Sequence, residues 1–365
     1  PPSAGSRREW GAAARRAAVE GCVPQQVGPH VALGGGRFAD DTAPPDALVA
    51  AVDGTGGWSV GETLHEARAL AGKVQGRRTT IELLHPLDVP PGDWDVALRT
   101  TWVEPAYLEP DASWCVPGGE PATPLANGGA FGGKAASMAP AAARRLADEH
   151  GRPVRVLLSR EDVVRLGPKR PPVAGGARAD GSGAIRLVRT PGVAEAIRVV
   201  APGMEVEEVD VPGPPTSASV RAAGWAEAAV LLAAARGDPT VTAPSGATAT
   251  AAFSDDGALQ VRVRCGQALD EVVLRSYCVG AAHMALGWVR TEGIAVDAEG
   301  RPHDLTIRSF GILPSRDMPE VHVLIEPSDD PPVNGSDAVF AAVAAAAWTE
   351  DGLVPRWPTR RGRAG

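Results

Sequence analysis

The sequence predicts an α+β fold, with strands and helices packed in layers and more than one domain. Strand-like and helix-like segments are mixed without the regular βαβ alternation that a parallel sheet needs. With 365 residues, the chain exceeds what one hydrophobic core usually holds. Two runs of alternating apolar and polar residues flank an Asp-Gly turn at 254–257, which is typical of an antiparallel hairpin.

Hydrophobic periodicity and capping residues predict the individual elements in order. Residues 1–30 are rich in Arg, Ala, Gly and Pro, so we expect loose order there apart from a short helix near 10–20. The predicted strands are 47–52, 79–84, 95–102, 154–158, 185–189, 248–253, 259–264, 305–308 and 321–325. The predicted helices are 63–73, 135–150, 219–236, 279–289 and 338–348.

Composition excludes several classes of function. The net charge of −8 argues against a nucleic-acid footprint, and basic residues cluster only near the C-terminus. No apolar run approaches the roughly 20 residues of a membrane span, and Arg7-Arg8 is not followed by the apolar stretch of a signal peptide, so a cytoplasmic protein is expected. The four cysteines lack CxxC spacing, so side chains are expected to hold neither zinc nor an iron–sulfur cluster.

Residues 127–134, Asn-Gly-Gly-Ala-Phe-Gly-Gly-Lys, form the most informative motif. Glycine lets the backbone adopt positive φ and approach a ligand closely, and successive free amides can bind an anion. The predicted helix 135–150 follows, and its N-terminus would favour a phosphate. The alternative interpretation is a glycine-rich turn that only begins this helix.

Other motifs follow one another in a definite order. They are the segments 102–110, 151–162, 167–170, 216–224, 277–300 and 310–325. With the glycine loop, this order resembles the molybdenum-cofactor subunit of the xanthine dehydrogenase and aldehyde oxidase family. The resemblance implies two mixed α/β layered domains of the molybdopterin-binding type. The family's second cofactor segment would fall between residues 237 and 248, where only about ten residues lie, so the second domain is expected to be truncated.

The resemblance also suggests a division of the chain. A loosely ordered N-terminal segment and a small α/β segment precede the first molybdopterin-binding-like domain. A truncated second domain of the same type and a basic tail follow it. The predicted boundaries are 1–30, 31–90, 91–240, 241–350 and 351–365.

By the same resemblance, the glycine loop would bind a molybdenum–molybdopterin cofactor, with an apolar ring beside the metal. The matching cofactor-binding positions are Gly129, Ala130, Phe131, Gly132 and Gly133. No side chain of this chain is expected to ligate the metal.

Two further positions match catalytic residues of the family. Arg221 corresponds to an arginine of the substrate pocket, which can pair with an oxyanion. Asp337 stands where the family has a glutamate that acts as general base. Its alternative interpretation is an ordinary helix N-cap. We expect Phe131, Arg221 and Asp337 to line one pocket between the two domains.

The implied function is hydroxylation of an aldehyde or an aza-heterocycle carbon with oxygen taken from water. It would require an iron–sulfur subunit and a flavin subunit as partners, besides a small-molecule substrate. Two alternatives remain open. The chain is either a cofactor-free enzyme that reuses the same cleft through Arg221 and Asp337, or a non-catalytic remnant or partner subunit.

Overall fold

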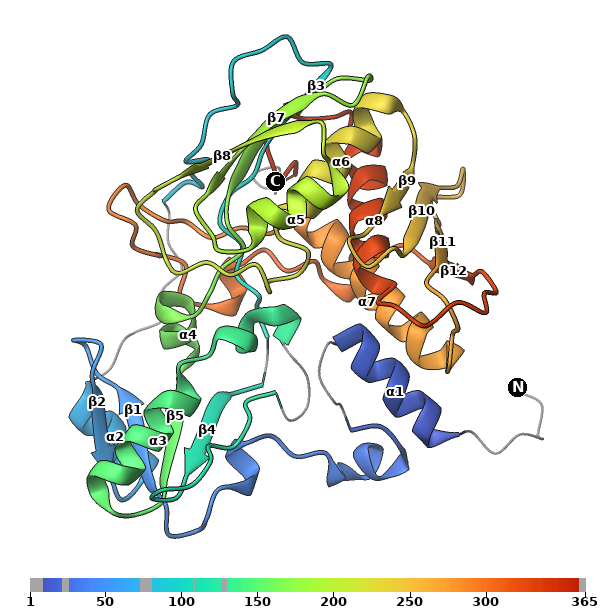
Figure 1. Cartoon of the computed structure of the whole chain (residues 1–365). Helices are drawn as coiled ribbons and strands as arrows, with labels where there is room; N and C mark the ends of the chain where they lie inside the picture. The colour runs from blue at the N-terminus through green and yellow to red at the C-terminus, as the bar shows by residue number, and fades with distance from the viewer. Residues whose placement is uncertain (1–8, 22–25, 73–80, 108, 126–129, 361–365) are drawn as a thin grey trace.

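The computed structural model describes residues 9–21, 26–72, 81–107, 109–125 and 130–360. Within these residues, three four-stranded sheets each contain both parallel and antiparallel strand pairs, and helices pack against them (Figure 1). The architecture is therefore mixed and consistent with the predicted α+β class.

The first sheet forms a separate lobe at the lower left of Figure 1. Its order is β2-β1-β5-β4, with strands Trp58–Gly61, Leu48–Val52, Val154–Leu158 and Asp111–Cys115. All five residues of β1 are buried, because helix α2 (Leu64–Ala71) packs beside β1 and β2 while β5 pairs with β1 in parallel. Helix α3 (Ala139–His150) packs on β4 and β5.

The second sheet has the order β3-β6-β7-β8, formed by Val96–Arg99, Val173–Ala177, Gly183–Val188 and Met204–Val209. Helices α5 (Val193–Val200) and α6 (Trp225–Arg236) pack against each other beside it. Helix α4 (Arg160–Leu166) connects β5 to this part of the chain. Its N-terminus is closed by a capping box between Ser159 and Asp162.

The third sheet has the order β12-β11-β10-β9, formed by Val321–Ile325, Leu259–Arg264, Thr248–Phe253 and Thr240–Thr242. The predicted hairpin is confirmed: Phe253 pairs with Leu259, and Gly257 in the turn has a φ of 83°. Beside this sheet, helices α7 (Glu271–Arg290) and α8 (Ser336–Glu350) pack together. Helix α7 is long and apolar enough to cross a membrane by length and composition, but half of its apolar window is buried inside the protein.

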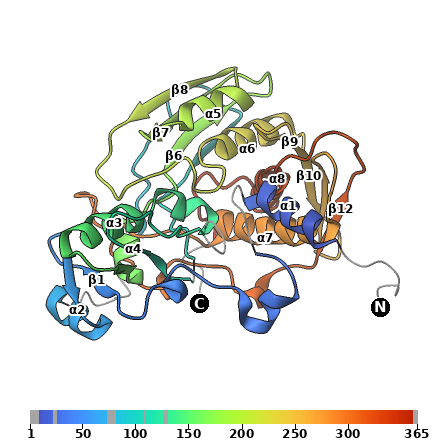
Figure 2. The ribbon, with the colours of Figure 1, turned by 60° about the horizontal axis from the view of Figure 1, so that its bottom comes forward.

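Helix α1 (Trp10–Gly21) packs against α7, although the two helices are far apart in the sequence (Figures 1 and 2). The side chains of Arg16 and Glu20 are fully buried. A charged pair is buried at low cost only when it is well paired and hydrogen-bonded, so α1 is integrated into the core at these two residues.

Several predicted boundaries are corrected by the structure. Helix α6 begins at Trp225 rather than at 219, because Ala222 and Gly224 have positive φ and interrupt the helix. Helix α3 begins at Ala139, after a 3₁₀ turn at Ala130–Ala136. Its C-terminal Gly151 is left-handed, as the sequence predicts.

Two predicted strands are wrong in the described residues. Residues 305–308 overlap a 3₁₀ turn, Ile307–Ser309, instead of forming a strand. Residues 81–84 form no strand, and residues 79–80 lie outside the described part of the chain. Alternation of apolar and polar residues is a weak signal when a segment has no neighbouring strand to pair with.

The predicted division into five segments stays a prediction. Strand β1, from the predicted segment 31–90, pairs with β5, from the predicted first domain. In the predicted tail, Trp357 is buried, and its backbone N–H donates to the carbonyl of Arg99 at 2.9 Å. The N–H of Arg99 donates in turn to the carbonyl of Pro355 at 2.8 Å.

Candidate functional site

The described part of the glycine loop is the 3₁₀ turn Ala130–Ala136. Phe131 and Gly132 both have positive φ, 55° and 89°. The Phe131 ring is partly exposed, at 43% of its surface. Gly129 lies outside the described residues. In the described part of the loop, the backbone thus has the positive φ that glycine allows, and Phe131 shares it.

The glycines of this turn face the protein's own chain. A Cβ on Gly132 would lie 1.4 Å from the carbonyl oxygen of Ser219. A Cβ on Gly133 would lie 3.1 Å from Pro105 and 3.2 Å from Tyr107. Close approach to the backbone of Ser219 explains Gly132 without a ligand, and the neighbouring side chains of Pro105 and Tyr107 explain Gly133.

The structure links the three sequence-predicted residues through one backbone hydrogen bond and one ion pair. The backbone N–H of Arg221 donates to the carbonyl of Phe131 at 3.0 Å. The Arg221 Nε lies 3.1 Å from Oδ1 of Asp337. Arg221 is largely buried, and its guanidinium lies 5.8 Å from the centre of the Phe340 ring. These contacts join the glycine loop, the segment before α6 and the start of α8.

Asp337 lies in the first turn of α8, but its side chain does not cap the helix. Instead, Oδ1 of Asn334 accepts the backbone N–H of Asp337 at 3.0 Å. The interpretation of Asp337 as an ordinary N-cap is therefore wrong. Its carboxylate faces Arg221 and is available for chemistry.

We expect Asn334→Ala to lower the free energy of unfolding by about 1–2 kcal/mol, because Asn334 makes the capping hydrogen bond. Urea unfolding measures this loss. Ser254→Ala, which removes a hydroxyl from an exposed turn, serves as a control with a smaller effect. Equal stability of Asn334→Ala and the wild type would contradict the capping role.

The environment of Asp337 favours its protonated form. Burial raises the pKa of the carboxyl, and the charge of Arg221 opposes that rise. With its pKa raised, the Asp337 carboxylate is a stronger base than an ordinary aspartate.

A second ion pair, between Arg170 and Glu227, lies next to the backbone of Arg221. Arg170 makes two hydrogen bonds to the Glu227 carboxylate, at 3.0 and 2.8 Å, and both side chains are buried. Arg170 also donates to the carbonyl of Arg221 and stacks 4.0 Å from the centre of the Trp288 ring. The sequence singles out the motif that ends at Arg170 but gives no sign of its partner. Glu227 lies in the interior of the predicted helix 219–236, but in the structure it is the third residue of α6.

Glu292 is a further acid near Arg170, half-buried in the folded chain, that is absent from the sequence-predicted site. Its burial raises the pKa of the carboxyl to about 8, and the charge of Arg170 lowers it only in part. The residue lies just after α7, within the motif 277–300, but only its surroundings in the folded chain distinguish it.

This pKa predicts a pH-dependent stability. Between the ordinary value of 4.5 and about 8, the unfolded chain has lost the proton that the folded chain retains, so stability falls as the pH rises. Glu292→Gln should remove this fall and be more stable than the wild type by on the order of 2 kcal/mol at pH 8, with little difference at pH 5. Urea unfolding across this range measures it. A difference that stays constant with pH, as expected for the exposed control Glu350→Gln, would contradict the assignment.

A cavity of about 260 Å³ lies beside Tyr107 and Asp111, at the first sheet. None of Phe131, Arg221 and Asp337 lines it. Arg221 contacts both Phe131 and Asp337, but a shared pocket between the domains stays a prediction.

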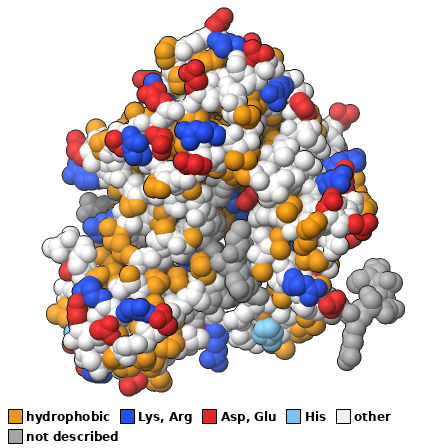
Figure 3. Space-filling view, viewed as in Figure 1, with side chains coloured by type: hydrophobic (Ala, Val, Ile, Leu, Met, Phe, Trp, Pro, Cys, Tyr) orange, Lys and Arg blue, Asp and Glu red, His pale blue; other side chains and the backbone are white. Residues whose placement is uncertain are grey.

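Basic and acidic side chains are scattered over the face shown in Figure 3. Lys and Arg side chains there alternate with Asp and Glu over most elements, and apolar side chains lie between them. That face carries no single-sign field of the kind that binds nucleic acid.

No family model matches the chain, and no curated protein matches it. Solved structures do resemble it. Quinoline 2-oxidoreductase from Pseudomonas putida 86 is 12% identical, with a TM-score of 0.27 over 52% of this chain and 37% of that one. Aldehyde oxidoreductase from Desulfovibrio gigas is 16% identical, with a TM-score of 0.28 over 53% and 35%.

Aldehyde oxidoreductase from Desulfovibrio desulfuricans ATCC 27774 is 13% identical, with a TM-score of 0.31 over 87% of this chain and 52% of that one. The chain thus spans between a third and about half of the length of these structures. The similarity to these oxidoreductases is one of low identity, low TM-score and partial coverage.

One buried donor of Arg221 lacks a partner among the described residues. Nη2 of Arg221 is buried and has no hydrogen-bond partner among them, which leaves a donor for an oxygen-bearing anion. Across the described part of the chain, no group of three or more His, Cys, Asp or Glu side chains could hold a metal ion. A metal here would have to arrive on a cofactor that supplies its own ligands.

Proposed function

We propose that this chain is an oxidoreductase subunit of the molybdenum hydroxylase type, which hydroxylates an aldehyde or an aza-heterocycle carbon with oxygen from water. The observation that supports the proposal is the convergence of Phe131, Arg221 and Asp337. The three residues come from distant segments of the sequence, and Arg221 contacts each of the other two. A cytoplasmic location and iron–sulfur and flavin partner subunits belong to the same proposal.

Each residue has a role that its surroundings allow. The turn with Ala130, Phe131, Gly132 and Gly133 would contact the molybdenum–molybdopterin cofactor. When bound, that cofactor would supply the two-electron oxidation. The Phe131 ring, partly exposed, would exclude water from the substrate.

Arg221 and Asp337 would act on the substrate and on a proton. Nη2 of Arg221 would bind a substrate oxygen or ring nitrogen with its spare donor. The Asp337 carboxylate would accept a proton, and its pairing with Arg221 would fix its direction. Arg170 would hold the backbone of Arg221 in place through the carbonyl that it binds.

A second candidate is a protein of this fold without the cofactor, either an enzyme that uses Arg221 and Asp337 alone or a non-catalytic partner. The close contact between Gly132 and Ser219 favours it, because the chain itself fills the space that a ligand would need. In this case the surviving loop maintains packing.

Turnover in H₂¹⁸O distinguishes the two candidates. The protein, expressed with molybdate and with its co-purifying subunits, is incubated with aromatic aldehydes and aza-heterocycles and an artificial electron acceptor. The proposal predicts products that carry one ¹⁸O atom, detected by mass spectrometry. Unlabelled products, or none with any substrate from a molybdenum-loaded preparation, would contradict it.

A further inference from the structure

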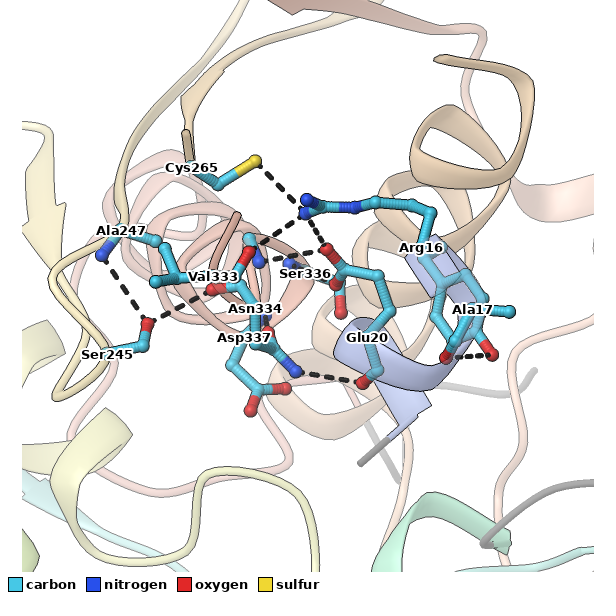
Figure 4. A network of polar contacts seen from close by, with 12 residues as sticks. Arg16, Ala17, Glu20, Ser245, Ala247, Cys265, Val333, Asn334, Ser336 and Asp337 are labelled. Atoms are coloured by element: carbon cyan, nitrogen blue, oxygen red, sulfur yellow. Dashed lines mark hydrogen bonds and ion pairs between the residues drawn. The ribbon is translucent and has the colours of Figure 1, made fainter. Parts of the chain in front are cut away.

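The first turn of α8 is held by a side chain from the opposite end of the chain. Glu20, on α1, accepts hydrogen bonds from the backbone N–H groups of Gly335 at 3.0 Å and Ser336 at 2.9 Å (Figure 4). These N–H groups have no partner within the helix and lie at its positive end, where a carboxylate is stabilised. Gly335, the N-cap residue, has no side chain for this task.

Asn334 connects this contact to Asp337. Its side-chain N–H donates to the backbone carbonyl of Glu20 at 2.8 Å, and its Oδ1 accepts the backbone N–H of Asp337 at 3.0 Å. Glu20 of helix α1 therefore accepts three hydrogen bonds from the turn that leads to Asp337.

Arg16 fixes Glu20 within this arrangement. The two side chains form an ion pair with no exposed surface. Arg16 also donates to the carbonyl of Val333 at 2.9 Å and to that of Gln267 at 3.3 Å. The pair is thus anchored to the segment before α8 and to the segment before α7, and Glu20 has little freedom to move.

We propose that Glu20 is a positioning residue for Asp337: it orders the first turn of α8 and so determines where the Asp337 carboxylate meets Arg221. Its bearing on turnover rests on the proposed function, but the arrangement itself does not. The charged groups that face Asp337 are Arg221 before α6, Glu20 on α1 and Arg170 before β6. The negative charge of Glu20 adds to burial in raising the Asp337 pKa, while the two arginines lower it.

The test compares Glu20→Gln with the wild type, without cofactor or substrate. Hydrogen exchange of the Gly335 and Ser336 amides should become about tenfold faster, because a Gln side chain keeps only one acceptor oxygen and loses the charge. The pKa of Asp337, followed by ¹³C NMR and assigned with Asp337→Asn, should fall, because the negative charge of Glu20 is removed. The matched control is Glu271→Gln, which removes an exposed carboxylate from the first turn of α7.

Unchanged exchange at both amides, or an Asp337 pKa that moves no more than in Glu271→Gln, would overturn the proposal. A general loss of packing would accelerate exchange throughout α8 rather than at its first turn, and it would also overturn the proposal. If Glu20→Gln does not fold because Arg16 is left buried and unpaired, the double variant Arg16→Met with Glu20→Gln is measured against the same criteria. Absence of molybdenum would refute the proposed function and leave these results unaffected.

Discussion

Gly132→Ala is expected to lower the free energy of unfolding by about 3–5 kcal/mol, the size of effect that marks a steric conflict with the backbone. The added Cβ would lie 1.4 Å from the carbonyl oxygen of Ser219, and backbone atoms cannot rotate away as a flexible side chain can. The positive φ of 89° adds a smaller cost. Urea or thermal unfolding measures the loss.

Gly151→Ala provides the matched control. Gly151 also has positive φ, 61°, but no atom lies within 4 Å of the position where its Cβ would be. Only the conformational cost of about 1 kcal/mol is expected there. Equal losses in the two variants would show that the Gly132 turn can move away from Ser219. Because Gly132 packs so closely on Ser219, loss of metal in a Gly132 variant would indicate a disturbed fold and would not by itself indicate a lost cofactor-binding loop.

Asp337→Ala is expected to reduce turnover by roughly two to four orders of magnitude if the proposed function holds, as for loss of a general base. Stability should fall by only about 1 kcal/mol, because Asn334 and not Asp337 makes the capping bond. The assay is the ¹⁸O-labelled turnover described above, with unfolding measured on the same preparations.

Two variants separate the chemical role from a structural one. Asp337→Asn keeps the shape of the side chain without its charge and should be nearly as inactive as Asp337→Ala. Asp337→Glu should keep or improve turnover, since it restores the longer reach of the family's glutamate. Full activity in Asp337→Ala with only a lower Tm would contradict the catalytic role.

Local signals account for the features that the sequence predicts correctly. The Asp-Gly turn places Gly257 between β10 and β11, and Gly151 ends α3 in the left-handed conformation, because each glycine acts within a few residues of itself. The positive φ at Ala222 that delays α6 has no such signal, since alanine rarely adopts it.

In the candidate site, too, some residues can be identified from the sequence and others only from the fold. Phe131, Arg221 and Asp337 belong to motifs, so each can be found from the sequence, but their contacts depend on the fold. Glu20 cannot be found in advance, because it lies 315 positions from the amide of Gly335 that it binds. An acid in a short N-terminal helix is normally expected to face solvent.

We propose that the loop with Phe131, together with Arg221 and Asp337, forms a cofactor-dependent oxidation site. Plasma mass spectrometry measures the molybdenum content of the intact protein purified after expression with molybdate. We expect about one molybdenum atom per chain, with a pterin released on denaturation, and a large loss of both in an Arg221→Met variant that remains folded. A folded wild-type protein from molybdate-supplied cells that contains neither molybdenum nor pterin would contradict it.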